Sequence, residues 1–178
     1  MTRITLFKLG IVAVFILMFT KMSIAQYASI QNTNLQIFGV LDSQKVGSAT
    51  NNYLVRLNKE TGEFKISIAV DDLISTARPA TYKPDTTLNE GKYLVFIGQV
   101  PLKDVLDKRI TSFDIQVPIE IEFNDIYDET YFVFNVFLMA NKGFNVVGKG
   151  VVNHQKLQIE NLEGFEPELQ INLNFVGY

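Results

Sequence analysis

Three residue types are missing or nearly missing from this sequence. Its 178 residues include no cysteine, no tryptophan and a single histidine, His154. Without cysteine the chain forms neither a disulfide nor a Cys–His catalytic pair, and one histidine cannot supply the several imidazoles of a zinc site. His154 lies in the polar turn Asn153–Gln155, where we expect it to be solvated and without a catalytic role.

Carboxylates are the remaining candidates for chemistry. Asp125, Asp128 and Glu129 crowd into one turn and could offer oxygen ligands to calcium, but their spacing fits no calcium loop. Turns favour such residues for backbone reasons, so whether this turn binds an ion is left open. Glycoside hydrolysis would need two carboxylates across a cleft, and no tryptophan is present to stack a sugar. The sequence therefore predicts a protein that is not an enzyme, with no catalytic residue, metal or cofactor.

The first 25 residues have the plan of a secretory signal peptide. Arg3 and Lys8 precede the largely apolar run Leu9–Phe19, and Ser23 and Ala25 are small residues at positions −3 and −1 of a cut after Ala25. The alternative is a membrane anchor, but the apolar run is shorter than the roughly 20 residues of a spanning helix. We therefore predict a signal peptide over residues 1–25 and one domain over residues 26–178.

The charge of the mature chain limits its partners. Of the 16 Lys and Arg residues three leave with the signal peptide, so 13 remain against 19 Asp and Glu, a net charge of −6. Phosphate binding needs clustered Lys and Arg, so neither nucleic acid nor an anionic membrane surface is expected as a partner. The mature protein is predicted to be periplasmic or secreted and to lack a stable membrane anchor. A homodimer is left open.

One stretch, Phe113–Met139, carries the strongest structural signal. Apolar residues occupy every odd position of Phe113–Phe123, which is the period of a strand with one buried face. After the polar turn Asn124–Glu129, the run Tyr131–Met139 is apolar except at Asn135, so we predict a strand buried on both faces. Together these segments predict a hairpin at the centre of an all-β domain.

Weaker alternation elsewhere predicts further strands. A loop is expected over 42–52, a tight turn at 59–62 with Gly62 at positive φ, and an irregular crossover over 71–91 with Leu73 and Ile74 tucked beneath it. One or two helical turns are expected over 102–108, where Leu102, Val105 and Leu106 share a face. The predicted strands span 35–41, 53–58, 64–70, 93–100, 113–123, 131–139, 144–152, 157–159 and 169–175.

Successive antiparallel hairpins close into a barrel or into two packed sheets. Three of the 14 phenylalanines lie in the predicted signal peptide, and the 11 others suit a wide interior better than a thin core. We therefore predict an all-β fold, a single antiparallel β-barrel of about eight strands with one short helix, a size that encloses side chains or one small ligand. Gly148 and Gly150 are expected where a strand bends sharply.

From Glu60 onward the chain resembles the YceI-like family, which consists of periplasmic, lipocalin-like β-barrels that hold a polyisoprenoid or another long amphiphile. The resemblance rests on the glycine-led strand and acidic turn Thr61–Leu73, on Leu88–Phe96, and on the closing segments Leu157–Phe165 and Leu169–Phe175. The chain departs from the family in lacking its opening pattern with a histidine and its "L-T-hydrophobic-H-G" stretch. The Gly-x-Trp signature of true lipocalins is absent because the sequence has no tryptophan.

The resemblance implies an exported carrier or scavenger that binds an isoprenoid or fatty-acid-like ligand in the barrel lumen. Two alternatives remain: an envelope β-sandwich that serves as a protein-interaction module, and an enzyme, which would require carboxylates that converge in a cleft with raised pKa values. The residues predicted to line the lumen and bind the ligand are Phe64, Ile66, Ile68, Phe96, Ile119, Ile121, Phe132, Phe134 and Phe175.

Overall fold

The structure is a computed structural model, and it describes residues 27–77, 91–102, 111–140, 143–160, 162 and 164–178. The predicted signal peptide lies outside the described residues, as does nearly all of the predicted helix over 102–108. Among the described residues, no helix has the length and apolar character needed to cross a bilayer.

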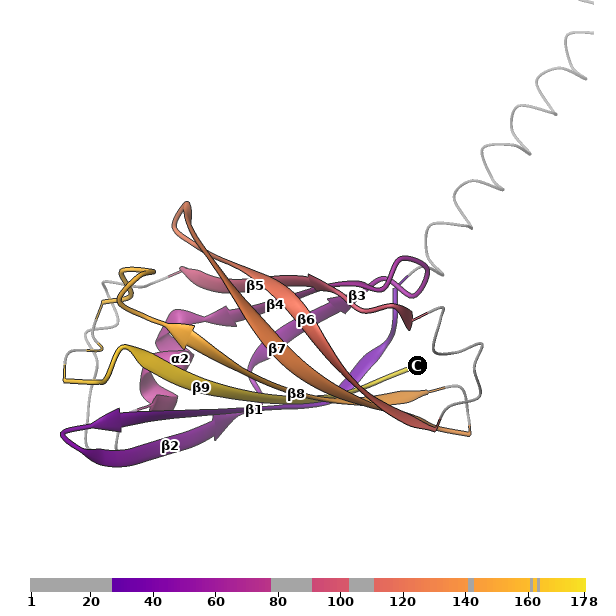
Figure 1. Cartoon of the computed structure of the whole chain (residues 1–178), viewed down its shortest axis with the longest axis horizontal. Coiled ribbons are helices and arrows are strands. Elements are labelled where there is room, and N and C mark those ends of the chain that lie inside the picture. The colour runs from indigo at the N-terminus through magenta and orange to yellow at the C-terminus, as the bar shows by residue number, and fades with distance from the viewer. Residues whose placement is uncertain (1–26, 78–90, 103–110, 141–142, 161, 163) are drawn as a thin grey trace, which may run out of the picture.

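The described strands form a single antiparallel sheet that curls around one apolar core (Figure 1). Its nine strands follow the order β2-β1-β9-β8-β7-β6-β5-β4-β3, so all belong to one layer and two packed sheets do not form. The predicted single antiparallel barrel is therefore confirmed, with nine strands rather than about eight. The strands are β1 (Ile30–Leu41), β2 (Gln44–Thr50), β3 (Tyr53–Leu57), β4 (Glu63–Ala69), β5 (Tyr93–Gln99), β6 (Ser112–Phe123), β7 (Ile126–Leu138), β8 (Phe144–Asn153) and β9 (Glu168–Gly177).

Period-two alternation decides which side chains enter the core. In β6, the central strand of the prediction, Val117, Ile119 and Ile121 are buried, and Pro118 and Glu120 between them face outward, as expected. Phe113 and Ile115, at the start of the strand, are only partly buried against the core. The inner face of the sheet is thus apolar along its length, and burial of this face drives the sheet to curl.

Glycines in the wall leave room for aromatic rings in the interior. Gly148 and Gly150 both point inward from β8, and a Cβ atom at position 148 would lie 2.6 Å from the Phe134 ring. A Cβ atom at position 150 would overlap the ring of Phe132. Glycine at these two positions therefore has a packing reason, because the rings occupy the space that larger wall residues would take.

The barrel is joined between its first strand and its third. The backbone N–H of Ala28 donates to the carbonyl oxygen of Leu57 at 2.9 Å, and a β-bulge lies between Gln31 and Asn34 where β1 pairs with β9. The Tyr53 hydroxyl reaches across from β3 and donates to the carbonyl oxygens of Asn174 at 2.7 Å and of Asn34 at 3.1 Å. This hydroxyl ties β3 to β1 and β9 at the point where the bulge interrupts their ladder.

A helix packs against one end of the sheet (Figure 1). Helix α2 (Val70–Ala77) contacts β4 and the β1–β2 hairpin, and Val70 and Leu73 are fully buried. The burial of Leu73 confirms that part of the crossover prediction, but the irregular start expected from residue 71 is wrong because these residues are helical. The side chain of Ile74 lies outside the described parts of the chain.

The predicted loop over 42–52 is wrong, because it contains β2. Asp42 and Ser43, with φ of 48° and 64°, form a two-residue hairpin turn of the primed type. β2 pairs with the C-terminal half of β1, from Leu41↔Gln44 to Leu35↔Thr50. Backbone pairing with β1 makes this segment a strand. Its sequence shows almost no alternation of apolar and polar residues, so the strand could not be predicted from it.

The central hairpin also differs from its prediction in two respects. The turn is only Asn124 and Asp125, again with positive φ, so β7 begins at Ile126. The prediction that β7 is buried on both faces is wrong: Tyr131, Val133 and Phe137 are 62%, 50% and 44% exposed on the outer face. We refer to these three side chains, with the exposed Tyr127, as the outer stripe.

The short strand predicted over 157–159 is also wrong, because these residues form a turn. Leu157 and Ile159 are nevertheless buried, since the segment folds back over the core. Their spacing of two residues arises from a compact turn, in which the N–H of Ile159 donates to the carbonyl oxygen of His154 at 3.0 Å. The tight turn at 59–62 is confirmed, with Gly62 at a φ of 73°.

Replacing Tyr53 with phenylalanine is expected to loosen the junction between β3 and β1. Loss of the hydroxyl leaves two carbonyl oxygens without that donor, so the free energy of unfolding should fall by about 1–2 kcal/mol. The same change at Tyr93, which is exposed, serves as the control and should be nearly neutral. Urea unfolding of both variants measures the difference, and equal effects would contradict the role assigned to Tyr53.

The burial of the Tyr53 hydroxyl also predicts that the free energy of unfolding depends on pH. Burial raises the pKa of Tyr53 to about 12, since the ionised form is poorly solvated there. The neutral hydroxyl therefore stabilises the fold fully below pH 10, and this stabilisation is lost as the pH rises through 12. The unfolding free energy of Tyr53→Phe should accordingly fall less than that of the unmodified protein between these two pH values.

Candidate functional site

All nine residues predicted to line the lumen are buried in the interior of the sheet. Each is at most 3% exposed, and they come from five strands. The structure thus brings together a set of side chains that are far apart in sequence. The inward positions are Phe64, Ile66 and Ile68 on β4, Phe96 on β5, Ile119 and Ile121 on β6, Phe132 and Phe134 on β7, and Phe175 on β9.

These side chains pack against one another. The ring centroids of Phe64 and Phe134 lie 5.3 Å apart in an edge-on arrangement, and those of Phe96 and Phe132 lie 5.6 Å apart. An apolar cavity of about 10 Å³, which Phe64, Phe134 and Phe175 help to line, is close to the size of one water molecule. An apolar chain entering this interior would therefore have to displace aromatic rings.

The expectation that His154 is solvated is wrong. Its side chain is only 4% exposed, and its Nε2 lies 3.0 Å from the carbonyl oxygen of Glu166. Its backbone N–H also donates to the carbonyl oxygen of Pro167. These contacts join the turn after β8 to the segment before β9, so the described surroundings of His154 indicate a structural role.

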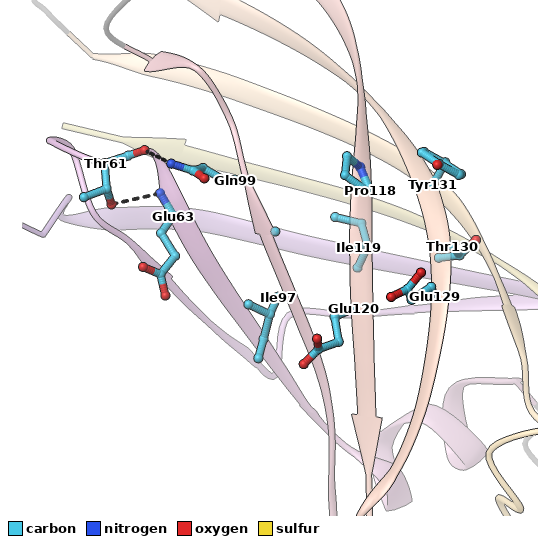
Figure 2. Close-up of a pocket in the computed structure, with 11 residues that line it drawn as sticks. Thr61, Glu63, Ile97, Gln99, Pro118, Ile119, Glu120, Glu129, Thr130 and Tyr131 are labelled. Carbon is cyan, nitrogen blue, oxygen red and sulfur yellow. Dashed lines mark hydrogen bonds between the residues drawn. The ribbon is translucent and has the colours of Figure 1, made fainter.

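The wall of the barrel is incomplete between β5 and β6. Only Val95–Ile97 pairs with Glu120–Glu122, although β6 runs for 12 residues. Figure 2 shows the two strands closest near Ile97 and Glu120 and separating toward Gln99 and Pro118. Pro118 has no N–H to donate, and the ladder ends before reaching it. We refer to this separation as the seam.

A groove of about 660 Å³ lies over the seam (Figure 2). Ile97, Gly98 and Gln99 line it from β5, and Pro118 and Ile119 line it from β6. Gly98 and Ile119 belong to the inner face of the sheet, so the groove reaches residues that otherwise face the core. Sequence reasoning placed Ile119 in the lumen but missed the groove. The available signal was Pro118, because a proline within a long alternating strand marks a place where pairing with a neighbouring strand can end.

Three glutamates line the groove and give it a negative charge. Glu63, Glu120 and Glu129 project from β4, β6 and β7, and all three are exposed (Figure 2). Glu120 lies directly opposite Glu129 in the β6–β7 ladder, an arrangement of like charges that costs stability. No Lys or Arg is among the residues that line the groove, and the nearest row of the sheet supplies Lys65 beside Ile97.

The negative field extends to the tip of the β6–β7 hairpin. Repulsion from the Glu122 carboxylate, then slight desolvation, and then repulsion from Asp125 and Glu120 raise the pKa of the exposed Tyr127. In the same hairpin Asp128 pairs with Lys156, with Nζ and Oδ1 3.3 Å apart. Among the described residues, no group of three or more His, Asp or Glu side chains is arranged to hold a metal ion.

Comparison with known proteins places the fold. No protein-family model matches the sequence, and no curated protein matches it. Among solved structures, the chain is similar to a polyisoprenoid-binding domain from Saccharophagus degradans implicated in plant cell wall breakdown, with a TM-score of 0.63. The match covers 86% of this chain and 97% of that domain at 10% sequence identity. The family resemblance noted from the sequence is thus confirmed at the level of the fold.

Replacing Phe134 with alanine is expected to open the interior. The ring is 2% exposed and contacts Phe64, so its loss should lower the free energy of unfolding by about 3–5 kcal/mol. The enlarged cavity should take up benzene or xenon, because an apolar cavity of this kind stays dry. Val133→Ala, on the outer face of the same strand, is the control and should change neither property, whereas a Phe134→Ala variant of unchanged stability would contradict the packing described.

Proposed function

We propose that this protein is an exported carrier or scavenger that binds the hydrocarbon chain of an isoprenoid or fatty-acid-like amphiphile inside the barrel. The observation that carries the proposal is the apolar interior, which extends to an open groove through Gly98 and Ile119. The fold shared with a polyisoprenoid-binding domain supports the same class of ligand. The nine predicted lumen residues are its proposed contacts.

Binding of this kind requires the interior to expand. The aromatic rings that fill it can rotate about their side-chain torsions while the strands stay paired, and a bound chain would replace the contacts that the rings give up. Burial of each methylene contributes roughly 0.8 kcal/mol, so a long chain can offset the cost of separating the rings. Few polar contacts would then be needed, and the buried side chains of the described barrel interior offer none.

The ligand prediction is tested by native mass spectrometry of the mature protein purified from a periplasm. We expect an adduct of one ligand per chain that organic extraction removes, with the mass of a long-chain amphiphile. The extracted protein should then bind farnesol, a neutral isoprenoid alcohol, when this is added back. A protein that carries no adduct and takes up neither farnesol nor a fatty acid would contradict the proposal.

Export is tested separately by expressing the whole chain in a Gram-negative host. Cleavage after Ala25 should give a soluble periplasmic product that begins at Gln26, which its intact mass reveals. Ala25→Phe should accumulate the precursor, because a bulky residue at position −1 blocks cleavage. Recovery of the full-length chain in the membrane fraction would instead favour the anchor alternative.

A second candidate function is that of a protein-interaction module, and the outer stripe favours it. Exposed aromatic and apolar side chains in a row are common where a partner binds. If this function is correct, double substitution of Val133 and Phe137 by serine should abolish crosslinking to an envelope partner without altering ligand binding, because neither residue lines the groove. The ligand-binding function is preferred because the fold similarity and the interior support it together.

A further inference from the structure

The seam leaves one edge of β6 open beside the core. In the part of the chain that the structure describes, Ser112–Ile119 pairs only with β7, because the ladder with β5 covers Glu120–Glu122 alone. Within the described wall, the part of this edge that faces β5 without pairing is Pro118 and Ile119, beside Gln99 and Gly98. Here the opening coincides with a groove of about 660 Å³.

Phe64 separates this groove from the interior. A Cβ atom at position 98 would lie 2.6 Å from Cζ of Phe64 and 2.6 Å from Cδ1 of Ile119, so both side chains lie directly behind Gly98. Phe64 also contacts Phe134 and lines the small interior cavity. A shift of both side chains would therefore connect the groove to the cavity, and glycine at position 98 adds no side chain of its own to the path.

The rim of the groove differs in chemistry from its floor. Ile97, Pro118 and Ile119 provide an apolar floor, whereas the three glutamates supply negative charge without a cation among the lining residues. Glu120 and Glu129 lie opposite each other in the β6–β7 ladder, where their like charges repel. A bound positive charge would relieve this repulsion, and a carboxylate or phosphate would increase it.

We propose that the seam is a lateral entry site for a long-chain amphiphile with a cationic head group. The hydrocarbon chain passes between Gly98 and Ile119 and displaces the side chains of Ile119 and Phe64, while the head group stays among Glu63, Glu120 and Glu129. This inference rests on the proposed function and adds to it the head-group class and the route of entry.

The head-group preference is tested by displacement of the neutral fluorescent probe N-phenyl-1-naphthylamine. Competitors of one chain length, dodecyltrimethylammonium, dodecanol and dodecanoate, are compared below their micelle-forming concentrations. We expect dodecyltrimethylammonium to bind about tenfold more tightly than dodecanoate, because each exposed ion pair adds a modest amount. The alcohol should lie between the two.

The triple variant E63Q/E120Q/E129Q should remove this preference while retaining affinity for dodecanol. The matched control E160Q/E166Q/E168Q changes the net charge equally at exposed carboxylates outside the groove, and it should keep the preference. Equal binding of the three head groups by the unmodified protein, or an unchanged preference in the groove variant, would overturn the head-group assignment. Failure of every amphiphile to bind would instead refute the proposed function itself.

The route of entry is tested by blocking the groove. Because the chain has no cysteine, Gln99→Cys gives a single thiol at an exposed position in the groove that a bulky maleimide can modify. We expect the modified protein to lose rapid uptake of dodecanol. Arg56→Cys, on the exposed face of β3, provides the modified control and should retain it. Uptake at the control rate with the groove blocked would overturn the lateral route, and circular dichroism establishes that each variant is folded.

Discussion

The packing of phenylalanine rings against glycines in the wall is the constraint on which this structure depends. Phe132 and Phe134 can occupy the interior because β8 presents Gly150 and Gly148 to them, and Phe64 likewise lies behind Gly98. A larger side chain at any of these three positions would occupy the space of a ring. The filled core therefore depends on these close contacts between rings and glycines.

Those features of the fold that depend on side-chain period could be predicted from the sequence. The alternation in β6 and β9 and the inward direction of the nine lumen residues follow from it, and the turn at Gly62 follows from a glycine that adopts positive φ. Strand β2 and the outer face of β7 could not be predicted, because backbone pairing decided the former and apolar residues face solvent in the latter. The helix over Val70–Ala77 was missed because its acidic first turn directly continues a strand pattern.

Of the candidate site, the lumen could be predicted from the sequence and the groove could not. Apolar alternation identifies the lumen, but the groove depends on where a ladder ends, and this is a property of two strands rather than one. Glu63, Glu120 and Glu129 are separated widely in sequence and look like ordinary solvated residues of alternating strands. Only the register between β4, β5, β6 and β7 brings them around one opening.

The pairing of β1 with β9 has a consequence for the order of folding. Ile30 lies opposite Gly177, so the two ends of the chain must meet before the sheet is continuous. Contacts between such distant segments form slowly, whereas the β6–β7 hairpin is local and can form early. A ribosome that still holds the last residues therefore keeps this sheet open. Until β9 arrives, the edges of β1 and β8 that it pairs with are open and can pair with other chains.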